Sequence, residues 1–265
     1  MRICSFQVSM SSQLTENVKT AIRSIEIATD KEADVALLPE MMVTGWGQHL
    51  HDFFAREAWI DEVTQGLYEI LKHVEKNGVR VLLGSPYSVA DSYVNAIILL
   101  DPVTGIQYVG GRMLIAPGWT KNWNFVGASS KAPIMIDQIL CGFVVCNEVG
   151  MLDQLEDSGI EQSQIIFWPG VTVNHYSEDS SLLHNSCAEG VRSISLRYRC
   201  PTIQASYINE INALPPTRRH GGIAVASEDG TVVYQAPDGR ETLIVCDVTL
   251  EKVGGSMLTR LSLIE

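Results

Sequence analysis

The sequence predicts an α/β fold in which two β-sheets pack face to face, with helices covering each sheet on its outer side. Two observations support this prediction. Strand-like apolar runs alternate with helix-like apolar stripes along the whole chain, which is typical of α/β proteins. There are also roughly ten candidate strands and few helices, more strands than one helix-covered open sheet usually holds. No repeat and no linker divides the sequence, so we expect a single domain over residues 1–265.

The first half of the chain alternates four strands with two helices. Apolar residues spaced three and four apart predict each helix, and Gly78 is well placed to end the second one. Short apolar runs predict the strands, and the turn 102–105 closes the fourth. In order, the predicted elements are strand 3–8, helix 14–29, strand 35–38, a helix with apolar positions from 60 to 74, and strands 79–84 and 95–101.

The second half continues the pattern with more strands than helices. Pro169-Gly170 ends one strand, Gln138 lies between two others, and the turn 228–230 connects a hairpin. In order, the predicted elements are strands 133–137, 140–146 and 165–168, helix 181–199, strand 202–207, a loop with Pro215-Pro216, and strands 222–226, 231–234 and 243–248.

Composition excludes several classes of partner. Lys and Arg number 19 against 31 Asp and Glu, so the formal net charge is −12, which disfavours nucleic acid and acidic membranes. No apolar stretch reaches the roughly 20 residues needed to cross a bilayer. The six cysteines include no C-x-x-C pair and no metal-ligand spacing. We therefore expect reduced thiols, a cytoplasmic location, no metal and no cofactor.

Two reactive side chains follow predicted buried strands. Cys146 ends the apolar run 139–145, and Glu40 follows the run 35–39. The ends of buried strands are where α/β folds place their chemistry. A thiol and a carboxylate at such ends suggest a nucleophile and its base for acyl transfer.

The order and spacing of several motifs resemble the nitrilase, or carbon–nitrogen hydrolase, superfamily. The resemblance implies a four-layer αββα sandwich, usually a homodimer or higher oligomer, that acts on a small amide or nitrile. It also implies that Glu40 is the general base and Cys146 the nucleophile. The motifs are Gln7, 33–40 with Thr44-Gly45-Trp46, Gly84-Ser85-Pro86, Asn95, Asp101-Pro102, Gly105, 142–146, Phe167-Trp168-Pro169, Gly221-Gly222 and Asp229-Gly230.

The third catalytic group of this superfamily, a lysine, has no counterpart in the matching stretch. Counting from Gly105, or backwards from Gly127, places Met113 in the lysine position, and a shift by one residue places Arg112 there. The nearest lysine is Lys121. The lysine supplies positive charge to the oxyanion, a contribution typically worth about 10²–10³ in rate. Arg112 could donate hydrogen bonds, whereas Met113 could only pack.

The remaining candidate site residues concern substrate binding. Asn95 and Trp168 occupy family positions, and Trp46 and Trp168 are candidate walls of a pocket. The main-chain amide of Asn147 is a candidate oxyanion donor, and Glu148 is interpreted as structural. Loops 46–55, 114–126 and 170–180 are expected to determine specificity.

Alternatives remain open for both site and function. A papain-like pair of Cys146 with His184 or His220 would replace the Glu40 arrangement, and His49 with His51 could present two imidazoles to a metal. The preferred function is a divergent amidase-like hydrolase. The alternatives are an inactive relative that binds a ligand or assembles, and an acyltransferase.

Overall fold

The structure is a computed structural model that describes residues 1–170, 173–175, 186–208, 218–220, 222–236, 239–253 and 256–264. For residues 173–175, 186, 218–220, 253 and 256 it describes the backbone alone. Of the predicted loop 170–180, residues 171–172 and 176–180 lie outside this description. So do the predicted loop at 215–216, the start of the predicted helix 181–199, His184 and the side chain of His220.

The elements alternate along the chain as predicted, with some additions. They are β1 (Arg2–Val8), α1 (Leu14–Asp30), β2 (Val35–Leu37), α2 (Leu50–Phe54), α3 (Trp59–Asn77), β3 (Arg80–Val89), β4 (Ser92–Asp101), β5 (Gly105–Gly111), α4 (Pro117–Trp123), β6 (Ile134–Ile136), β7 (Ile139–Phe143), the 3₁₀ helices η1 (Cys146–Leu155) and η2 (Ile160–Gln162), β8 (Ile165–Pro169), β9 (Val173–His175), α5 (Ser186–Tyr198), β10 (Thr202–Tyr207), β11 (Arg218–His220), β12 (Ala224–Ala226), β13 (Val232–Gln235), β14 (Thr242–Val253) and β15 (Ser256–Leu263).

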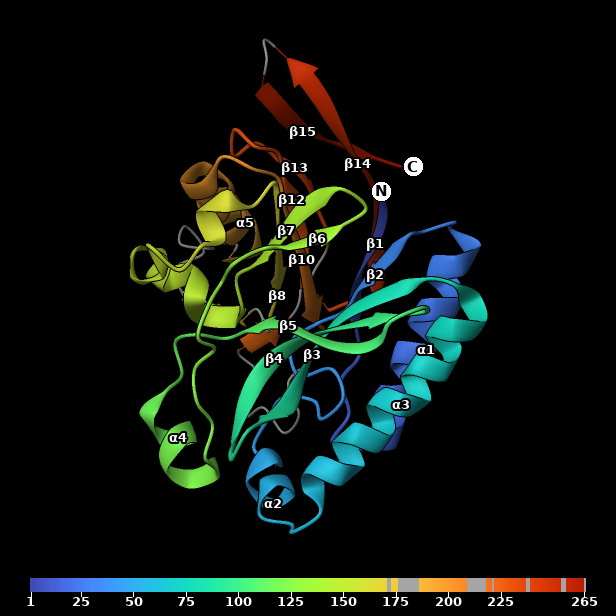
Figure 1. Cartoon of the computed structure of the whole chain (residues 1–265), viewed down its shortest axis with the longest axis vertical. Coiled ribbons are helices and arrows are strands. Elements are labelled where there is room, and N and C mark those ends of the chain that lie inside the picture. Colours follow the sequence, from blue (N-terminus) through green and yellow to red (C-terminus); the bar gives the residue numbers. More distant parts are fainter. Residues whose placement is uncertain are drawn as a thin grey trace.

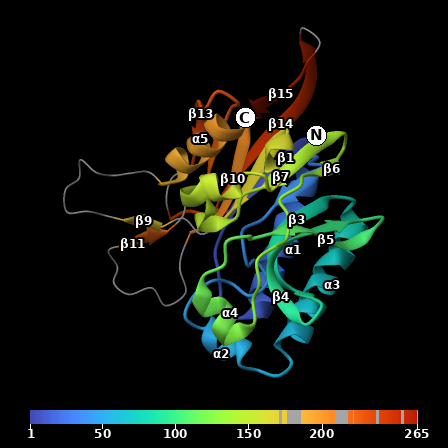
Figure 2. The same ribbon diagram turned by 60° about the vertical axis from the view of Figure 1, so that its left-hand side comes forward.

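The strands form two layers, and hydrogen bonds between one strand of each layer join them into a single sheet. Within the described residues, a 13-stranded sheet has the central order β5-β4-β3-β2-β1-β10-β8-β7-β6. β1 and β10 pair in parallel only near their ends, where Gln7 lies opposite Ser206 and Val8 opposite Tyr207. We expected two separate sheets, and this short contact is what joins them. Figure 2 shows the two sets of strands from the side.

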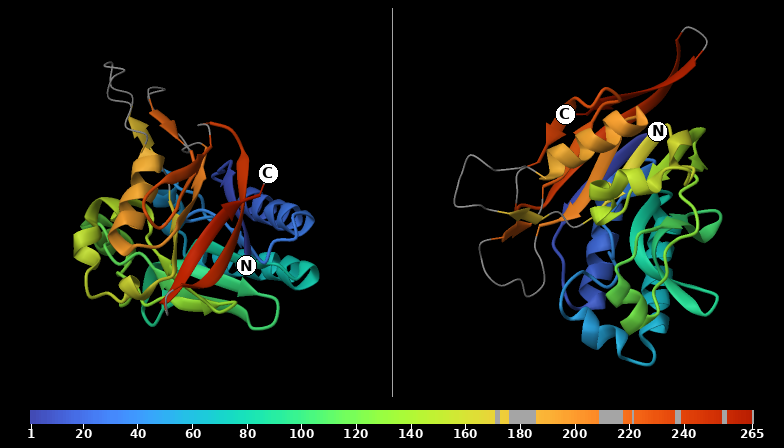
Figure 3. Two further views of the ribbon diagram at one scale, coloured as in Figure 1. Left: turned by 90° about the horizontal axis from the view of Figure 1, so that it is seen from above. Right: turned by 90° about the vertical axis from the view of Figure 1, so that its left-hand side faces the viewer.

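Three apolar clusters separate the four layers. Alternate residues of a strand face different clusters, as the pleat requires: in β8, Ile165 and Phe167 face the space between the sheets, while Ile166 and Trp168 face α5. Helices α1 and α3 lie side by side over one sheet, and α5 covers the other (Figures 1 and 3). This arrangement confirms the αββα prediction. The clusters contain Val18, Ile25, Ala36, Ile70 and Ile98; Val35, Leu37, Ile97, Phe143, Phe167 and Ile203; and Ile166, Trp168, Val191 and Ile194.

Helix α3 ends as its sequence predicts. Gly78 has φ 73°, in the left-handed region, and its N–H donates to the Val74 carbonyl at 2.8 Å. Glycine adopts this conformation without the steric cost that a side chain imposes. The chain can therefore turn directly into β3.

The sequence-based predictions missed several elements. They include β5, which has three glycines and little alternation, the short helices α2 and α4, and the edge strand β15 that pairs with β14. The strand predicted over 140–146 is also too long, because β7 ends at Phe143. Cys146 instead begins η1, three residues beyond the strand.

Candidate active site

Glu40 lies just beyond β2, on the first sheet, and its side chain is fully buried. The Asn95 amide on β4 donates a hydrogen bond to Glu40 Oε1 at 2.6 Å. Gly84 on β3 allows the chain to run this close, because a Cβ at that position would lie 2.4 Å from the Glu40 Cα. Asn95, which the sequence suggested as a substrate-binding residue, thus contacts the carboxyl group of Glu40.

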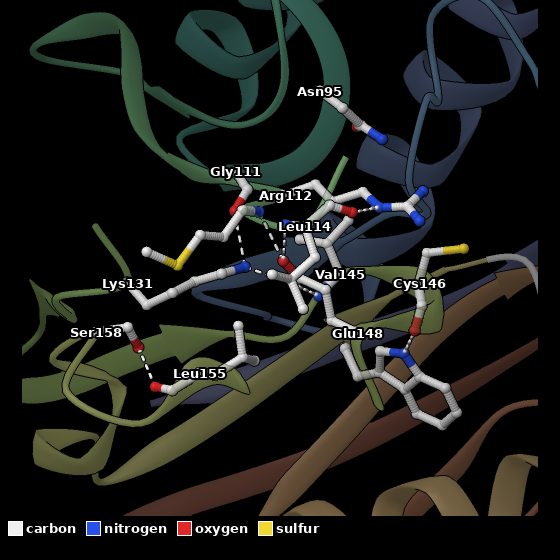
Figure 4. Close-up of polar contacts among 12 residues, drawn as sticks. Asn95, Gly111, Arg112, Leu114, Lys131, Val145, Cys146, Glu148, Leu155 and Ser158 are labelled. Atoms are coloured by element: carbon white, nitrogen blue, oxygen red, sulfur yellow. Dashed lines mark hydrogen bonds and ion pairs between the residues drawn. The ribbon is translucent and has the colours of Figure 1, made fainter. Parts of the chain in front are cut away.

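Cys146 lies beyond β7 of the second sheet, and its side chain is next to Glu40. Its φ of 54° is in the left-handed region, which a residue with a side chain seldom adopts. Such strain is concentrated at functional sites. The Trp168 indole N–H on β8 donates to the Cys146 carbonyl at 2.8 Å and so anchors this turn (Figure 4). Cys146 is partly exposed, whereas the other five cysteines are buried.

The Cys146 thiol and the Glu40 carboxyl group are hydrogen-bonded to each other. Burial raises the pKa of the Glu40 carboxyl above its ordinary value, while the Arg112 guanidinium and hydrogen bonds from the Cys146 thiol and the Asn95 amide lower it. A buried carboxylate with a raised pKa and a thiol as hydrogen-bond partner is suited to accept that thiol's proton. The two residues are 106 positions apart in the chain, and the two layers bring them together.

Of the two candidates for the lysine position, Arg112 is the one that faces Glu40. Its Nη1 lies 3.7 Å from Glu40 Oε1, and its Nη2 donates to the Asn147 side chain. Its Nε also donates to the Leu114 carbonyl at 3.0 Å, so the guanidinium is held in a fixed orientation. Met113 turns away and packs in the apolar cluster beneath α5.

A second buried ion pair, between Lys131 and Glu148, lies next to these residues, and the sequence does not predict the part played by Lys131. Lys131 Nζ is 2.5 Å from Glu148 Oε2, with the two side chains 1% and 0% exposed. The place of Glu148, two residues after Cys146, predicts a structural role. Lys131 stands in the ordinary-looking loop segment Ser129-Ser130-Lys131-Ala132-Pro133, where no sequence signal marks it as buried.

The other predicted residues have varied surroundings. Trp46 stacks on Trp119 with ring centroids 5.1 Å apart, Asn147 is exposed beside Cys146, and Lys121 is exposed on α4. His49 Nε2 is 2.9 Å from the Thr44 carbonyl, while His51 packs edge-on against Trp123. No cluster of three or more His, Cys, Asp or Glu side chains that could hold a metal occurs in the described part of the chain.

No helix among the described residues is long and apolar enough to cross a membrane.

Comparisons with known proteins agree with this geometry. A family model described as carbon-nitrogen hydrolase matches residues 2–256. A curated relative, the glutamine-dependent NAD(+) synthetase of Thermotoga maritima, is 29% identical over 137 residues, which are 50% of this chain and 23% of that protein. The chain thus matches less than a quarter of that relative's length.

Solved structures show the same fold. A mutant amidase from Nesterenkonia sp. AN1 in complex with acrylamide superposes with a TM-score of 0.73 at 13% identity, covering 92% of this chain and 89% of that one. Another structure of this amidase, in which the acetamide moiety of fluoroacetamide is attached to the active-site cysteine, gives the same four values. At this identity the likeness concerns the fold alone. The family match extends over nearly the whole sequence, and the chain belongs to the carbon-nitrogen hydrolase family.

Proposed function

We propose that this protein is an amidase-like hydrolase that cleaves a small linear amide, or the related nitrile, through a thioester on Cys146. The observation that carries the proposal is the hydrogen bond between the Cys146 thiol and the buried Glu40 carboxylate. A free thiol is only slightly ionised near neutral pH, so an adjacent base is what makes it a nucleophile.

The proposed reaction uses Glu40 for every proton transfer. Glu40 accepts the thiol proton as the sulfur of Cys146 bonds to the amide carbon, and the carbonyl electron pair moves to oxygen. When the tetrahedral adduct collapses, the C–N bond breaks and the leaving nitrogen takes the proton from Glu40. A water molecule then attacks the thioester while Glu40 accepts its proton. The C–S bond then breaks, Glu40 returns this proton to the sulfur, and the free thiol and the carboxylic acid product result.

Arg112 is proposed to stabilise the charge on the oxyanion. A guanidinium has five N–H donors, and one each goes to the Leu114 carbonyl and the Asn147 side chain. Others remain for the oxyanion, together with the main-chain N–H of Asn147. Because arginine stays protonated in proteins, Arg112 contributes charge and hydrogen bonds but transfers no proton.

The Nesterenkonia structures suggest the probes. That amidase is described with acrylamide bound and with an acetamide moiety attached to its active-site cysteine. We propose that the same small acyl amides and fluoroacetamide reach Cys146 here. Trp46 and Trp168 are proposed as walls around the acyl group.

The test is a panel of short amides and nitriles, with ammonia release measured in solution and the mass of the Cys146 peptide measured after quenching. We expect ammonia release and an acyl adduct with the wild type, and neither with Cys146→Ala. An adduct that yields its acyl group to hydroxylamine but not to water would indicate an acyltransferase. Absence of both adduct and release across the panel would favour the ligand-binding alternative, in which loss of the family lysine ended turnover.

A further inference from the structure

The Lys131–Glu148 ion pair lies next to the candidate site, and both side chains are shielded from solvent. Besides Glu148, Lys131 Nζ donates to the Gly111 carbonyl at 2.7 Å, at the end of β5. Lys131 belongs to the connection from β5 to β6, which crosses from the first sheet to the second. Figure 4 shows the lysine extended from the left toward Glu148, with Arg112 above this contact and Cys146 to the right of it.

Glu148 links the two halves of the site through the main chain. Its Oε1 accepts hydrogen bonds from the N–H groups of Met113, at 2.6 Å, and Leu114, at 3.2 Å. Its Oε2 accepts one from the Val145 N–H at 2.8 Å. Met113 directly follows Arg112, and Val145 directly precedes Cys146. The Glu148 carboxylate therefore binds the main chain directly beside Arg112 and directly beside Cys146.

Three main-chain N–H groups and the Lys131 ammonium all donate to the two Glu148 oxygens. A carboxylate suits this arrangement because it has only acceptors and no hydrogen of its own. Burial lowers the pKa of Lys131, and the charge of Glu148 opposes that shift. The attraction of the two charges at 2.5 Å offsets part of the free-energy cost of burying them.

We propose that Lys131 and Glu148 are positioning residues that hold Arg112 and Cys146 at their working separation, a role that rests on the function proposed above. Neither side chain touches the reacting atoms in this scheme. Lys131 fixes the position of the Glu148 carboxylate. Glu148 in turn accepts hydrogen bonds from the main chain next to Arg112 and next to Cys146. A displacement of about 1 Å in such a site can reduce a rate by about 100-fold.

The primary test compares Lys131→Met with wild type and with Lys19→Met. Methionine keeps the length of the side chain and removes its charge. Lys19 also pairs with a glutamate, Glu16, but both are exposed. For Lys131→Met we expect kcat about 100-fold lower with KM changed less than about threefold, and for Lys19→Met no change. A Lys131→Met enzyme with wild-type kcat would overturn the proposal.

Alkylation of Cys146 by iodoacetamide provides a readout that does not require turnover. The other cysteines are buried, so in the native protein the reaction reports on Cys146, and peptide mass spectrometry identifies the site. We expect slower alkylation in Lys131→Met than in wild type. If the wild type hydrolyses no amide, the proposed function fails, and this comparison still decides whether the ion pair positions the thiol.

A double variant separates positioning from stability. Lys131→Met leaves a buried carboxylate without its cation and could fail to fold, whereas Lys131→Met combined with Glu148→Gln removes both charges. Glutamine can still accept from Met113 and Leu114, but its NH₂ group faces the Val145 N–H. We expect the double variant to melt near the wild-type temperature and to retain the defects in kcat and alkylation. Recovery of wild-type kcat and alkylation would refute the positioning role.

Discussion

Removal of the Arg112 charge provides the sharpest test of the assignments at the site. Arg112 Nη1 is 3.7 Å from Glu40 Oε1, and the two side chains are 8% and 0% exposed. At an effective dielectric constant of about 20, opposite unit charges at this separation attract by about 4 kcal/mol. Arg112→Met withdraws this attraction from the ionised form of Glu40 and also removes a donor from the proposed oxyanion site.

Two effects follow for the Arg112→Met variant. Since Arg112 lowers the pKa of Glu40, that pKa rises further without it, and the acid limb of the activity profile moves to higher pH. The lost oxyanion donor reduces kcat by about 10²–10³ even where Glu40 is ionised. The rate should therefore rise with pH in the variant over a range where the wild type has reached its plateau.

The assay is kcat/KM for the best amide from pH 5 to pH 9, with Cys146 alkylation measured over the same range. Arg197→Met is the matched control, because Arg197 pairs with Glu156 on the exposed surface. Arg112→Lys, which restores the family's residue type, should retain more activity than Arg112→Met. If the Arg112→Met profile superposes on the wild-type profile, Arg112 neither tunes Glu40 nor stabilises the oxyanion.

Three further predictions concern groups around the site. The raised pKa of Glu40 means that its ionised form destabilises the fold, a cost absent below the ordinary pKa of 4.5 and complete above the raised one. Thermal scans of Glu40→Gln should thus show a higher Tm than wild type at pH 8 and no gain at pH 4. Trp168→Phe removes the donor to the Cys146 carbonyl, and alkylation should slow about fivefold, as expected for one hydrogen bond of about 1 kcal/mol. A Cβ on Gly190 would lie 2.2 Å from the Trp168 ring, so Gly190→Ala should reduce kcat, while Gly150→Ala, whose Cβ meets nothing within 4 Å, should leave it unchanged.

Much of the fold could be predicted because its signals are local. The apolar stripe of α1, the left-handed stop at Gly78 and the alternation in β8 each report on a face or an end of one element. Elements with weak local signals were missed. β5 contains three glycines, and β15 is held by its ladder with β14. A strand of that kind is specified by its neighbour rather than by its own pattern.

The candidate site divides in the same way. Glu40 and Cys146 could be proposed as candidates because each closely follows a buried strand, β2 and β7 respectively. The choice between Arg112 and Met113 could not be made from sequence, since it depends on how the chain leaves β5. Lys131 could not be found at all: its burial and its partner are created by a crossing connection between two sheets.

Residue periodicity and motif spacing were enough to predict the αββα architecture and the family, and to propose Glu40 and Cys146 as candidate base and nucleophile, because these patterns are properties of nearby residues. Three features became evident from the three-dimensional arrangement: Arg112 is the cation that faces Glu40, the Cys146 backbone is left-handed, and Lys131 and Glu148 are buried together. Those features arise from contacts between segments far apart in the chain. The free energy of such contacts depends on the distance between the groups and on their burial, and local sequence patterns do not reveal either quantity.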